Sequence, residues 1–367
     1  MKKLKKYSLF ITLLAFTLLS CSKKEQGDLL EIPIDINQVG MLNLSEITES
    51  ITAIELELTD ESILNPDHIG KVFLFKDEIF VGTAEKILVF NKTGKFLRSI
   101  GSKGHGPGEY ARIHNFALDE KNKCLFITSS EAKILSYDLN GNFIKEVRWR
   151  GGLNNEMNYI DGKLLLLVEK FDDNTSGIIN SQPTLFQLNK DMQVVDSCII
   201  RNLHIESNIS MVLNRNADFI LKGTKSTYLY YGDFWVRMPL GEKMLCDTLY
   251  RLEDNQLIPE LKLKFRNEVN SIFLSLYNIY RSSRYVFSTY TTREQRGNYY
   301  LFCYDTKTNK GYSQLNGLTD DIHRIENPKS IRPFSLDTEM FYYFHTHIKD
   351  DDRDEPNPTL YIGKLKK

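Results

Sequence analysis

The sequence predicts an all-β chain that folds as a six-bladed β-propeller of four-stranded antiparallel blades. Three observations support this prediction. The chain contains 21 Phe and 19 Tyr, and aromatic residues suit pleated, half-buried sheets. Helical periodicity with caps is absent from every long stretch, and residues 267–284 are only a weak helix candidate. A strand–turn–strand unit recurs roughly every 47 to 63 residues, the length that a four-stranded blade with its loops requires.

The repeat is clearest between residues 79–96, IFVGTAEKILVFNKTGKF, and residues 126–143, FITSSEAKILSYDLNGNF. A shift of 47 residues aligns the two KIL strings and places Gly94 on Gly141. In each unit the glycine supplies the positive φ of a hairpin turn before the last strand. A sandwich would have shorter and more even strand spacing, and the rungs of a β-helix would be about half as long. Weaker copies of the central strand occur at 185–188, 248–252, 301–304 and 360–365, so six blades are favoured over seven.

The sixth unit reaches the end of the chain on its third strand. Its fourth strand must therefore come from the N-terminal segment, where SITAIELEL (50–58) and LLEIPIDI (29–36) are the two candidates. Such a pairing would join the two ends of the chain, close the ring and cover an open strand edge.

The first twenty residues have the order of a lipoprotein signal. Four lysines precede an apolar stretch from Leu9 to Leu19, which is shorter than the ~20 residues that span a bilayer. The string Leu-Leu-Ser-Cys that ends at Cys21 resembles the bacterial lipobox, which implies cleavage before Cys21 and acylation of that cysteine. The predicted organisation is a signal peptide (1–20), a flexible tether (21–28) and a propeller domain (29–367).

The charge of the mature chain limits its partners. Without residues 1–20 the formal net charge moves from −1 to about −5, so nucleic acid is not expected as a partner. Lys23 and Lys24 directly follow the acylated cysteine, whereas surface-export tags in related bacteria are acidic there. We therefore expect a lipid anchor in the outer membrane, with the periplasmic side favoured over the cell surface, and a monomer.

The string IGSKGHGPGEYARIHNFALDEKNKCLFITSSEAKILSYDLNGNF (100–143) resembles the NHL-type repeats of six-bladed β-propeller lipoproteins of Bacteroidetes. In that group Gly-x-x-Gly-x-Gly-Pro-Gly-Glu-(Phe/Tyr) links one blade to the next. Residues 247–265 and 357–367 are similar to its late blade and its C-terminal end. The resemblance implies an architecture and an envelope location, but no reaction. The residues that match the linker motif are Gly101, Gly104, Gly106, Pro107, Gly108, Glu109 and Tyr110.

A phosphate-binding loop is the alternative interpretation of the same glycines. Such a loop needs Gly-Lys-Ser/Thr at its end and a helix after it, and neither follows Tyr110. We therefore expect a structural crossover, in which Gly106-Pro107-Gly108 turns the chain and Tyr110 wedges between two blades.

Two histidines are the candidate metal ligands that a local pattern indicates. His345 and His347 lie two residues apart in FYYFHTHIKDDDRDEP (341–356), so on a strand they would share a face and could bind a divalent metal. A third ligand at recognisable spacing is missing, and half-exposed strand histidines explain the pair more simply. The mixture of arginines and tyrosines in 283–300 suits a sugar or peptide surface, or a charged hairpin.

The remaining cysteines give no metal motif. Cys124, Cys198, Cys246 and Cys303 form no CxxC pair, so a zinc site is not expected. They are interpreted as small buried hydrophobes, and their disulfide pairing cannot be deduced from the sequence.

Two functions are consistent with these observations. The first is a non-catalytic, membrane-anchored module that binds a protein or glycan partner, with the lipid on Cys21 as its only attached group. The second is an envelope hydrolase or lyase with a metal or histidine site on the propeller axis. Because Gly-x-Ser-x-Gly and His-Glu-x-x-His are both absent, no catalytic residue is predicted and the first function is favoured.

Overall fold

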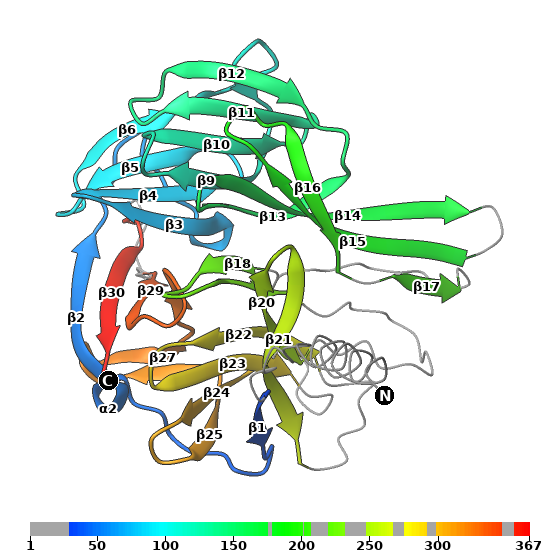
Figure 1. Ribbon diagram of the computed structural model, residues 1–367. Helices are drawn as coiled ribbons and strands as arrows, with labels where there is room; N and C mark the ends of the chain where they lie inside the picture. The colour runs from blue at the N-terminus through cyan, green and yellow to red at the C-terminus, as the bar shows by residue number, and fades with distance from the viewer. Residues whose placement is uncertain are drawn as a thin grey trace, which may run out of the picture.

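The computed structural model describes residues 29–174, 178–200, 202–206, 219–231, 247–266, 275–291, 299–346 and 356–367. The predicted signal peptide, the tether with Cys21, Cys246 and His347 lie outside these ranges. Six antiparallel sheets follow one another around a ring, which confirms the six-bladed β-propeller (Figure 1).

Each blade has four strands, which follow one another from the axis outward. Blade one contains β3 (Ile69–Phe75), β4 (Glu78–Thr83), β5 (Ile87–Asn91) and β6 (Phe96–Ile100). Blade two contains β9 (Ile113–Asp119), β10 (Cys124–Ser129), β11 (Lys133–Asp138) and β12 (Phe143–Arg148). Blade three contains β13 (Leu153–Ile160), β14 (Lys163–Asn174), β15 (Ile178–Leu188) and β16 (Val194–Ile199).

The second half of the ring follows the same order. Blade four contains β18 (Phe219–Lys222), β19 (Thr227–Tyr230), β20 (Thr248–Glu253) and β21 (Gln256–Phe265). Blade five contains β22 (Ser275–Arg281), β23 (Tyr285–Thr291), β24 (Tyr300–Asp305) and β25 (Lys310–Leu315). Blade six contains β28 (Arg332–Pro333), β29 (Met340–His345), β30 (Thr359–Leu365) and, from the other end of the chain, β2 (Thr48–Glu55).

The ring is closed by β2, as the sequence predicts. This strand pairs antiparallel with β30, with Thr52 opposite Ile362 and Ile54 opposite Leu360. The second candidate strand has another place: β1 (Leu30–Ile34) joins blade four as a fifth strand, parallel to β21. Both N-terminal segments therefore form strands, and the strand that overlaps 50–58 closes the ring.

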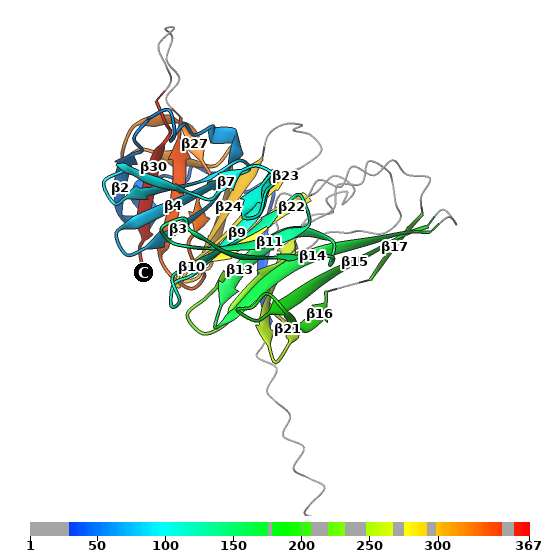
Figure 2. The same cartoon turned by 90° about the horizontal axis from the view of Figure 1, so that it is seen from above.

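Short elements connect the blades. They are α2 (Leu44–Ile47), η1 (Pro66–His68), β7 (Ser102–Lys103), β8 (Glu109–Tyr110), β17 (Leu203–Glu206), β26 (Leu318–Asp320) and β27 (Ile325–Lys329). Strands β14 and β15 continue beyond blade three as a two-stranded ribbon, which projects from the ring with β17 beside it (Figures 1 and 2). Within the described residues, no helix has the length and apolar character needed to cross a membrane.

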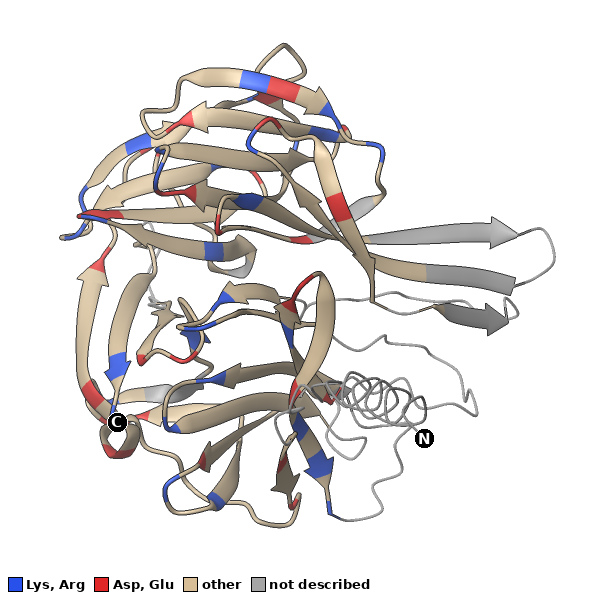
Figure 3. Ribbon diagram, viewed as in Figure 1, with Lys and Arg blue, Asp and Glu red and all other residues tan. Residues whose placement is uncertain are grey.

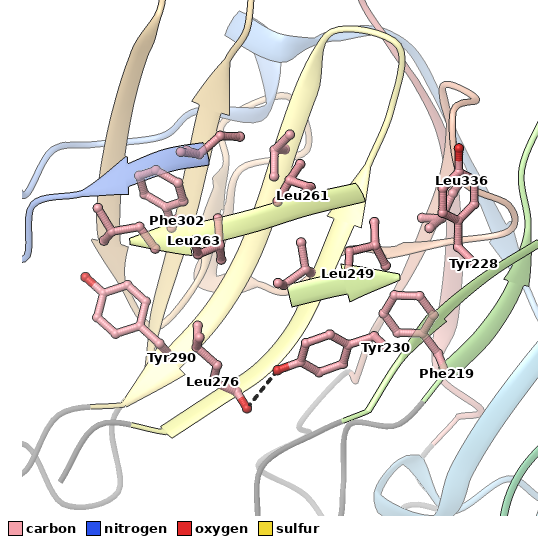
Figure 4. Packing of buried hydrophobic residues seen from close by; sticks show 14 residues of the cluster. Phe219, Tyr228, Tyr230, Leu249, Leu261, Leu263, Leu276, Tyr290, Phe302 and Leu336 are labelled. Atoms are coloured by element: carbon pink, nitrogen blue, oxygen red, sulfur yellow. Dashed lines mark hydrogen bonds between the residues drawn. The ribbon is translucent and has the colours of Figure 1, made fainter. Parts of the chain in front are cut away.

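The hydrophobic core lies between neighbouring blades rather than at one centre. Between blades four and five, for example, Phe219, Tyr230 and Leu249 pack against Leu276 and Tyr290 (Figure 4). The Tyr230 hydroxyl also donates a hydrogen bond to the Leu276 carbonyl at 3.2 Å. Since one blade alone leaves both of its faces uncovered, each sheet depends on its neighbours for burial.

The weak helix prediction for 267–284 is wrong where the structure describes it. Residues 275–281 form the inner strand β22, and 267–274 lie outside the described residues. A β-bulge between Leu276 and Asn278 adds one residue to this strand. The bulge places the buried residues Leu276 and Ile279 three positions apart, which is the spacing of a helix.

The interpretation of the cysteines is correct only for Cys303, which is 4 % exposed. Cys124 and Cys198 are half-buried, because Cys124 is the first residue of β10 and Cys198 lies on the outermost strand of blade three. All three are free thiols.

The glycine-rich segment joins β6 of blade one to β9 of blade two. Gly101 and Gly108 both have φ of +71°, and a Cβ at Gly108 would lie 2.6 Å from the Phe143 ring. The Glu109 carboxylate folds back onto the loop and accepts a hydrogen bond from the Gly106 amide at 2.9 Å. A Cβ at Gly104 would meet the same carboxylate at 2.0 Å. The loop's own side chain therefore occupies the place where a cradle would hold an anion.

Tyr110 lies between the first two blades. Its side chain is 1 % exposed and packs in a cluster that draws on both sheets, and its hydroxyl donates to the Ile100 carbonyl at 2.9 Å. The Tyr137 hydroxyl holds the loop from the other side, by a 2.8 Å bond to the Gly108 carbonyl. Burial raises the pKa of Tyr110 to about 12.

The raised pKa of Tyr110 predicts alkaline sensitivity. An unfolded chain releases the phenolic proton near its ordinary pKa of about 10, whereas the folded chain holds it to about 12. The tyrosine's contribution to the free energy of unfolding should therefore be complete below pH 10 and decline from pH 10 to 12. Tyr110→Phe should lower stability at pH 8 by about 1 kcal/mol and make its loss between pH 10 and 12 less steep. Urea denaturation at each pH measures both effects, and an unchanged slope in the variant would contradict this account of Tyr110.

Candidate functional site

The inner strands of four blades share a β-bulge near their first residues. In blades one, two, three and five the pairing with the second strand shifts by one residue at this point. In each of these blades, the residue that follows the extra residue of the bulge occupies the same position along the inner strand. A bulge changes the direction in which the neighbouring side chains point. Here the bulges direct polar side chains toward the centre of the ring, where regular strands would place apolar ones. The four equivalent residues are Lys71, Asn115, Glu156 and Asn278.

Three of these residues form one hydrogen-bonded group. Lys71 Nζ donates to the Glu156 carboxylate and to the Met157 carbonyl, and lies 3.4 Å from Asn115 Oδ1. Asn115 Nδ2 donates to the other Glu156 oxygen at 3.3 Å. Lys71 and Glu156 belong to blades one and three, which are not neighbours, so their side chains can meet only at the axis. Their side chains are 19 % and 10 % exposed, so the ion pair is mostly shielded from water.

Blades five and six supply the other part of the site. Arg332, the first residue of β28, donates to the Gly70 carbonyl at 2.6 Å and hydrogen-bonds the Tyr342 hydroxyl. Tyr280 from β22 lies close enough to Arg332 and Glu156 for their charges to affect its pKa. Its ring packs 5.1 Å from that of Phe219 in blade four. We call Lys71, Asn115, Glu156, Tyr280, Arg332 and Tyr342 the axial cluster.

The protonation states in the axial cluster follow from burial and charge. Burial raises the pKa of Tyr280 to about 12 against the opposing effect of Arg332, and burial also raises the pKa of Tyr342. Surrounding protein atoms partly desolvate the Arg332 guanidinium and lower its pKa although the residue is exposed, but Tyr342 and Tyr280 outweigh this effect and hold that pKa above its usual value. At neutral pH the tyrosines are therefore neutral and the guanidinium is charged.

The charges of the axial cluster do not cancel. Lys71 and Glu156 neutralise each other, while Arg332 forms no ion pair with any carboxylate among the described residues. Arg332 and Gly70 are exposed, and Lys71 and Asn115 are half-buried, so water reaches the cluster. Elsewhere the charged residues lie mainly at strand ends and on outer strands (Figure 3).

The axial cluster lies toward one face of the ring. In each blade the inner strand begins at the edge where the second and third strands are joined, and the crossovers between blades reach the same edge. The last residues of β19 and β23 and the first residues of β20 and β24 lie at this edge. The opposite face is formed by short turns, such as Lys76–Asp77 and Asp161–Gly162.

The structure describes only one of the two predicted metal ligands. His345 is the last residue of β29, the second strand of blade six, and is half-buried, while His347 lies outside the described residues. Across the described ranges, no three His, Cys, Asp or Glu side chains are grouped as a metal site would require. Two other histidines lie near the axial face: His68 precedes β3, and His114 is the bulge residue of β9. Burial and Arg112 lower the pKa of His114.

The arginine–tyrosine segment 283–300 is partly structural. Arg284 pairs with Asp305 at 2.7 Å and holds the pKa of that carboxyl down to about 2. Arg293 and Arg296 lie outside the described residues.

The axial cluster was not predicted from the sequence, although the sequence contains a weak indication of it. Ile69 and Ile113 open equivalent inner strands, and each is followed two positions later by a polar residue, Lys71 or Asn115. Strand alternation would place an apolar residue there, so a polar one marks the bulge.

Residues 29–365 match the family described as a domain of unknown function, DUF4934. The chain belongs to the DUF4934 family. No curated protein matches it.

The solved structure of a Bacteroides fragilis protein named "Putative exported protein (BF0058)" is similar over 92 % of this chain and 100 % of its own, at 16 % identity and a TM-score of 0.63. At that identity the likeness concerns the fold.

Two further solved structures are more distant. The β-propeller domain of Cps50 (Swd1) from Myceliophthora thermophila covers 86 % of this chain and 100 % of its own, at 11 % identity and a TM-score of 0.44. A Bacteroides caccae protein of unknown function covers 72 % and 81 %, at 12 % identity and a TM-score of 0.36.

The shielded ion pair predicts a stability effect at the axis. Lys71→Met leaves the Glu156 carboxylate without its cation, and we expect a loss of about 1–3 kcal/mol, less than for a fully dry pair because water reaches the cluster. Lys92→Met is the matched control, since Lys92 pairs with Asp77 in full exposure and should change stability by less than about 1 kcal/mol. Urea denaturation of both variants measures the difference, and equal losses would contradict the axial ion pair.

Proposed function

We propose that this protein is an exported envelope lipoprotein, anchored through acylated Cys21 in the outer membrane on the periplasmic side. Its propeller would act as a non-catalytic binding or scaffold module for a protein or glycan partner. The order of basic residues, apolar stretch and lipobox-like string supports the anchor. The name of the Bacteroides fragilis protein of similar fold supports export.

The observation that carries the binding role is the axial cluster. Inner strands of non-adjacent blades bring a lysine, a glutamate and an amide together, beside an arginine that has no carboxylate partner among the described residues. An exposed arginine beside polar groups that rigid strands hold in place is typical of a recognition site.

The anchor predicts a change in fractionation. Wild-type protein should sediment with the outer membrane and incorporate radiolabelled palmitate, because several acyl chains hold a domain on a bilayer firmly. Cys21→Ser should appear in the soluble envelope fraction or accumulate as precursor, without label. Cys198→Ser is the matched control and should behave as wild type. Membrane retention of unlabelled Cys21→Ser would contradict the proposed anchor.

The axial location of binding can be tested by blocking the site. Gly70 is exposed beside Arg332, and its φ lies outside the left-handed region, so a large side chain can be placed there. Gly70→Trp should reduce binding to envelope glycans and proteins, on an array of both, at least tenfold while keeping every charged group.

Lys92→Trp, on an exposed turn, is the control for the added indole and should bind as wild type. Partners that bind both variants equally would contradict an axial binding site.

A further inference from the structure

Three exposed arginines lie along one edge of blade two. Arg112 directly precedes the inner strand β9, Arg148 is the last residue of the outer strand β12, and Arg150 follows it after one residue. None of their side chains forms an ion pair or a hydrogen bond with another described residue. We call these three residues the arginine row. The described arginines that pair with carboxylates are, by contrast, all half-buried: Arg98, Arg251, Arg281 and Arg284.

Backbone hydrogen bonds hold the arginine row together at the short loop 130–132, between β10 and β11. The Ser130 amide donates to the Arg112 carbonyl at 3.0 Å, and the Trp149 amide donates to the Ala132 carbonyl at 2.7 Å. Strands β9 and β12 are three strand spacings apart, or about 14 Å, so the row is extended along the edge of the sheet. This edge belongs to the face of the ring toward which the axial cluster lies.

The edge has a surplus of positive charge. Besides the arginine row it contains Lys133, whose Nζ lies 3.6 Å from the Glu131 carboxylate and 3.8 Å from the Glu146 carboxylate. Four cationic side chains therefore stand against two carboxylates at this edge, although the mature chain as a whole is acidic. A local positive patch on an acidic protein attracts anionic ligands to that place.

The length of the arginine row favours a chain-like ligand. A guanidinium binds an anionic group with two oxygens through parallel N–H bonds. One small anion could occupy only one or two of three guanidiniums that are distributed from the inner to the outer strand. A polymer with repeated anionic groups can contact all of them.

The residues around the row favour a polysaccharide over a protein or a nucleic acid. Trp149 is 9 % exposed, and the exposed Phe143 and Ile144 lie at the opposite end of β12. The described residues of this edge thus expose no large apolar side chain. Protein interfaces usually have an apolar or aromatic centre, and single-stranded nucleic acids stack on exposed aromatic rings.

We propose that the arginine row binds an acidic polysaccharide, whose carboxylate or sulfate groups pair with the guanidinium groups of Arg112, Arg148 and Arg150. This inference goes beyond the axial site, since it assigns a second binding surface on the same face of the ring.

The first test compares ligands of one shape and different charge. Octagalacturonate and its fully methyl-esterified form share their sugar chain, but only the first is anionic. The wild-type protein should bind the acid at least tenfold more tightly than the ester, and the affinity should fall as the salt concentration rises. Isothermal titration at pH 7 measures both. A dextran sulfate oligomer against neutral dextran tests sulfate groups in the same way.

Protein variants locate the binding at the arginine row. Each single change, Arg112→Gln, Arg148→Gln or Arg150→Gln, should weaken binding of the preferred acidic oligomer about twofold to fivefold, because an exposed ion pair contributes modestly by itself. The triple variant should lose at least tenfold. Circular dichroism and the urea midpoint report whether each variant is folded.

The matched control removes the same charge from the opposite face. Lys95, Lys121 and Lys225 are exposed on the short turns that precede β6, β10 and β19. The triple variant Lys95→Gln/Lys121→Gln/Lys225→Gln should bind the acidic oligomer as wild type does.

Four results would overturn the inference. They are the absence of a preference for either acidic oligomer over its neutral form, unchanged binding in the folded arginine triple variant, an equal loss in the lysine control, and tighter binding of single-stranded DNA or of phosphatidylglycerol vesicles than of the oligomers.

The axial site is tested separately from the arginine row. Gly70→Trp should keep the affinity for the acidic oligomer, because Gly70 lies on the inner strand of blade one. Acidic glycans on the array are therefore compared with the arginine triple variant, and the other partners with Gly70→Trp. Loss of the other partners on Gly70→Trp would keep the axial function even if the arginine row binds nothing.

Discussion

The pairing of β2 with β30 is the constraint on which the rest of the structure depends. A four-stranded blade leaves two apolar faces uncovered, so each is stable only between neighbours, and a ring satisfies all six at once. The sixth blade takes its outer strand from the start of the chain, with Ile54 opposite Leu360. Without that strand, blade six would expose the edge of β30, and Leu360 would lose Ile54 from the cluster that it shares with residues of blade one.

Closure also creates the axial cluster. Lys71 and Glu156 are 85 residues apart and lie in non-adjacent blades, yet they form an ion pair because the ring brings their inner strands to one axis. Arg332 reaches the Gly70 carbonyl across the junction between the last and the first blade. The polar centre is thus a consequence of ring geometry, and its residues are fixed by strands rather than by loops. Such rigidity favours recognition, since little side-chain order has to be gained on binding.

The sequence predicts the fold well because each unit repeats a local pattern. Matching KIL strings and hairpin glycines define the blades, and the missing fourth strand in the last unit indicates the closure. The weak helix prediction for 267–284 fails because the bulge in β22 gives Leu276 and Ile279 helical spacing. The burial of Cys124 and Cys198 is overestimated because apolar neighbours do not reveal that Cys124 is the first residue of its strand or that Cys198 lies on the outermost strand of its blade.

The site is far less predictable from sequence than the fold. Lys71, Asn115, Glu156, Tyr280 and Arg332 come from five blades and form no motif, and a polar residue beside a bulge resembles any exposed strand residue. Of the two histidines predicted as metal ligands, His345 ends the second strand of blade six and is not a member of the axial cluster, and His347 lies outside the described residues. The glycine-rich loop, which resembles a phosphate cradle, is filled by its own Glu109.

Cross-linking of β2 to β30 tests ring closure most directly. Thr52 and Ile362 face each other in the pair, so a Thr52→Cys/Ile362→Cys variant should form a disulfide under mild oxidation, identified by mass spectrometry of the linked peptides. Thr52→Cys/Tyr361→Cys is shifted by one residue to the opposite face of the strand and should remain reduced. Linkage in the first variant alone is the result that this account predicts. Equal linkage in both, or none in either, would contradict closure by the N-terminal strand.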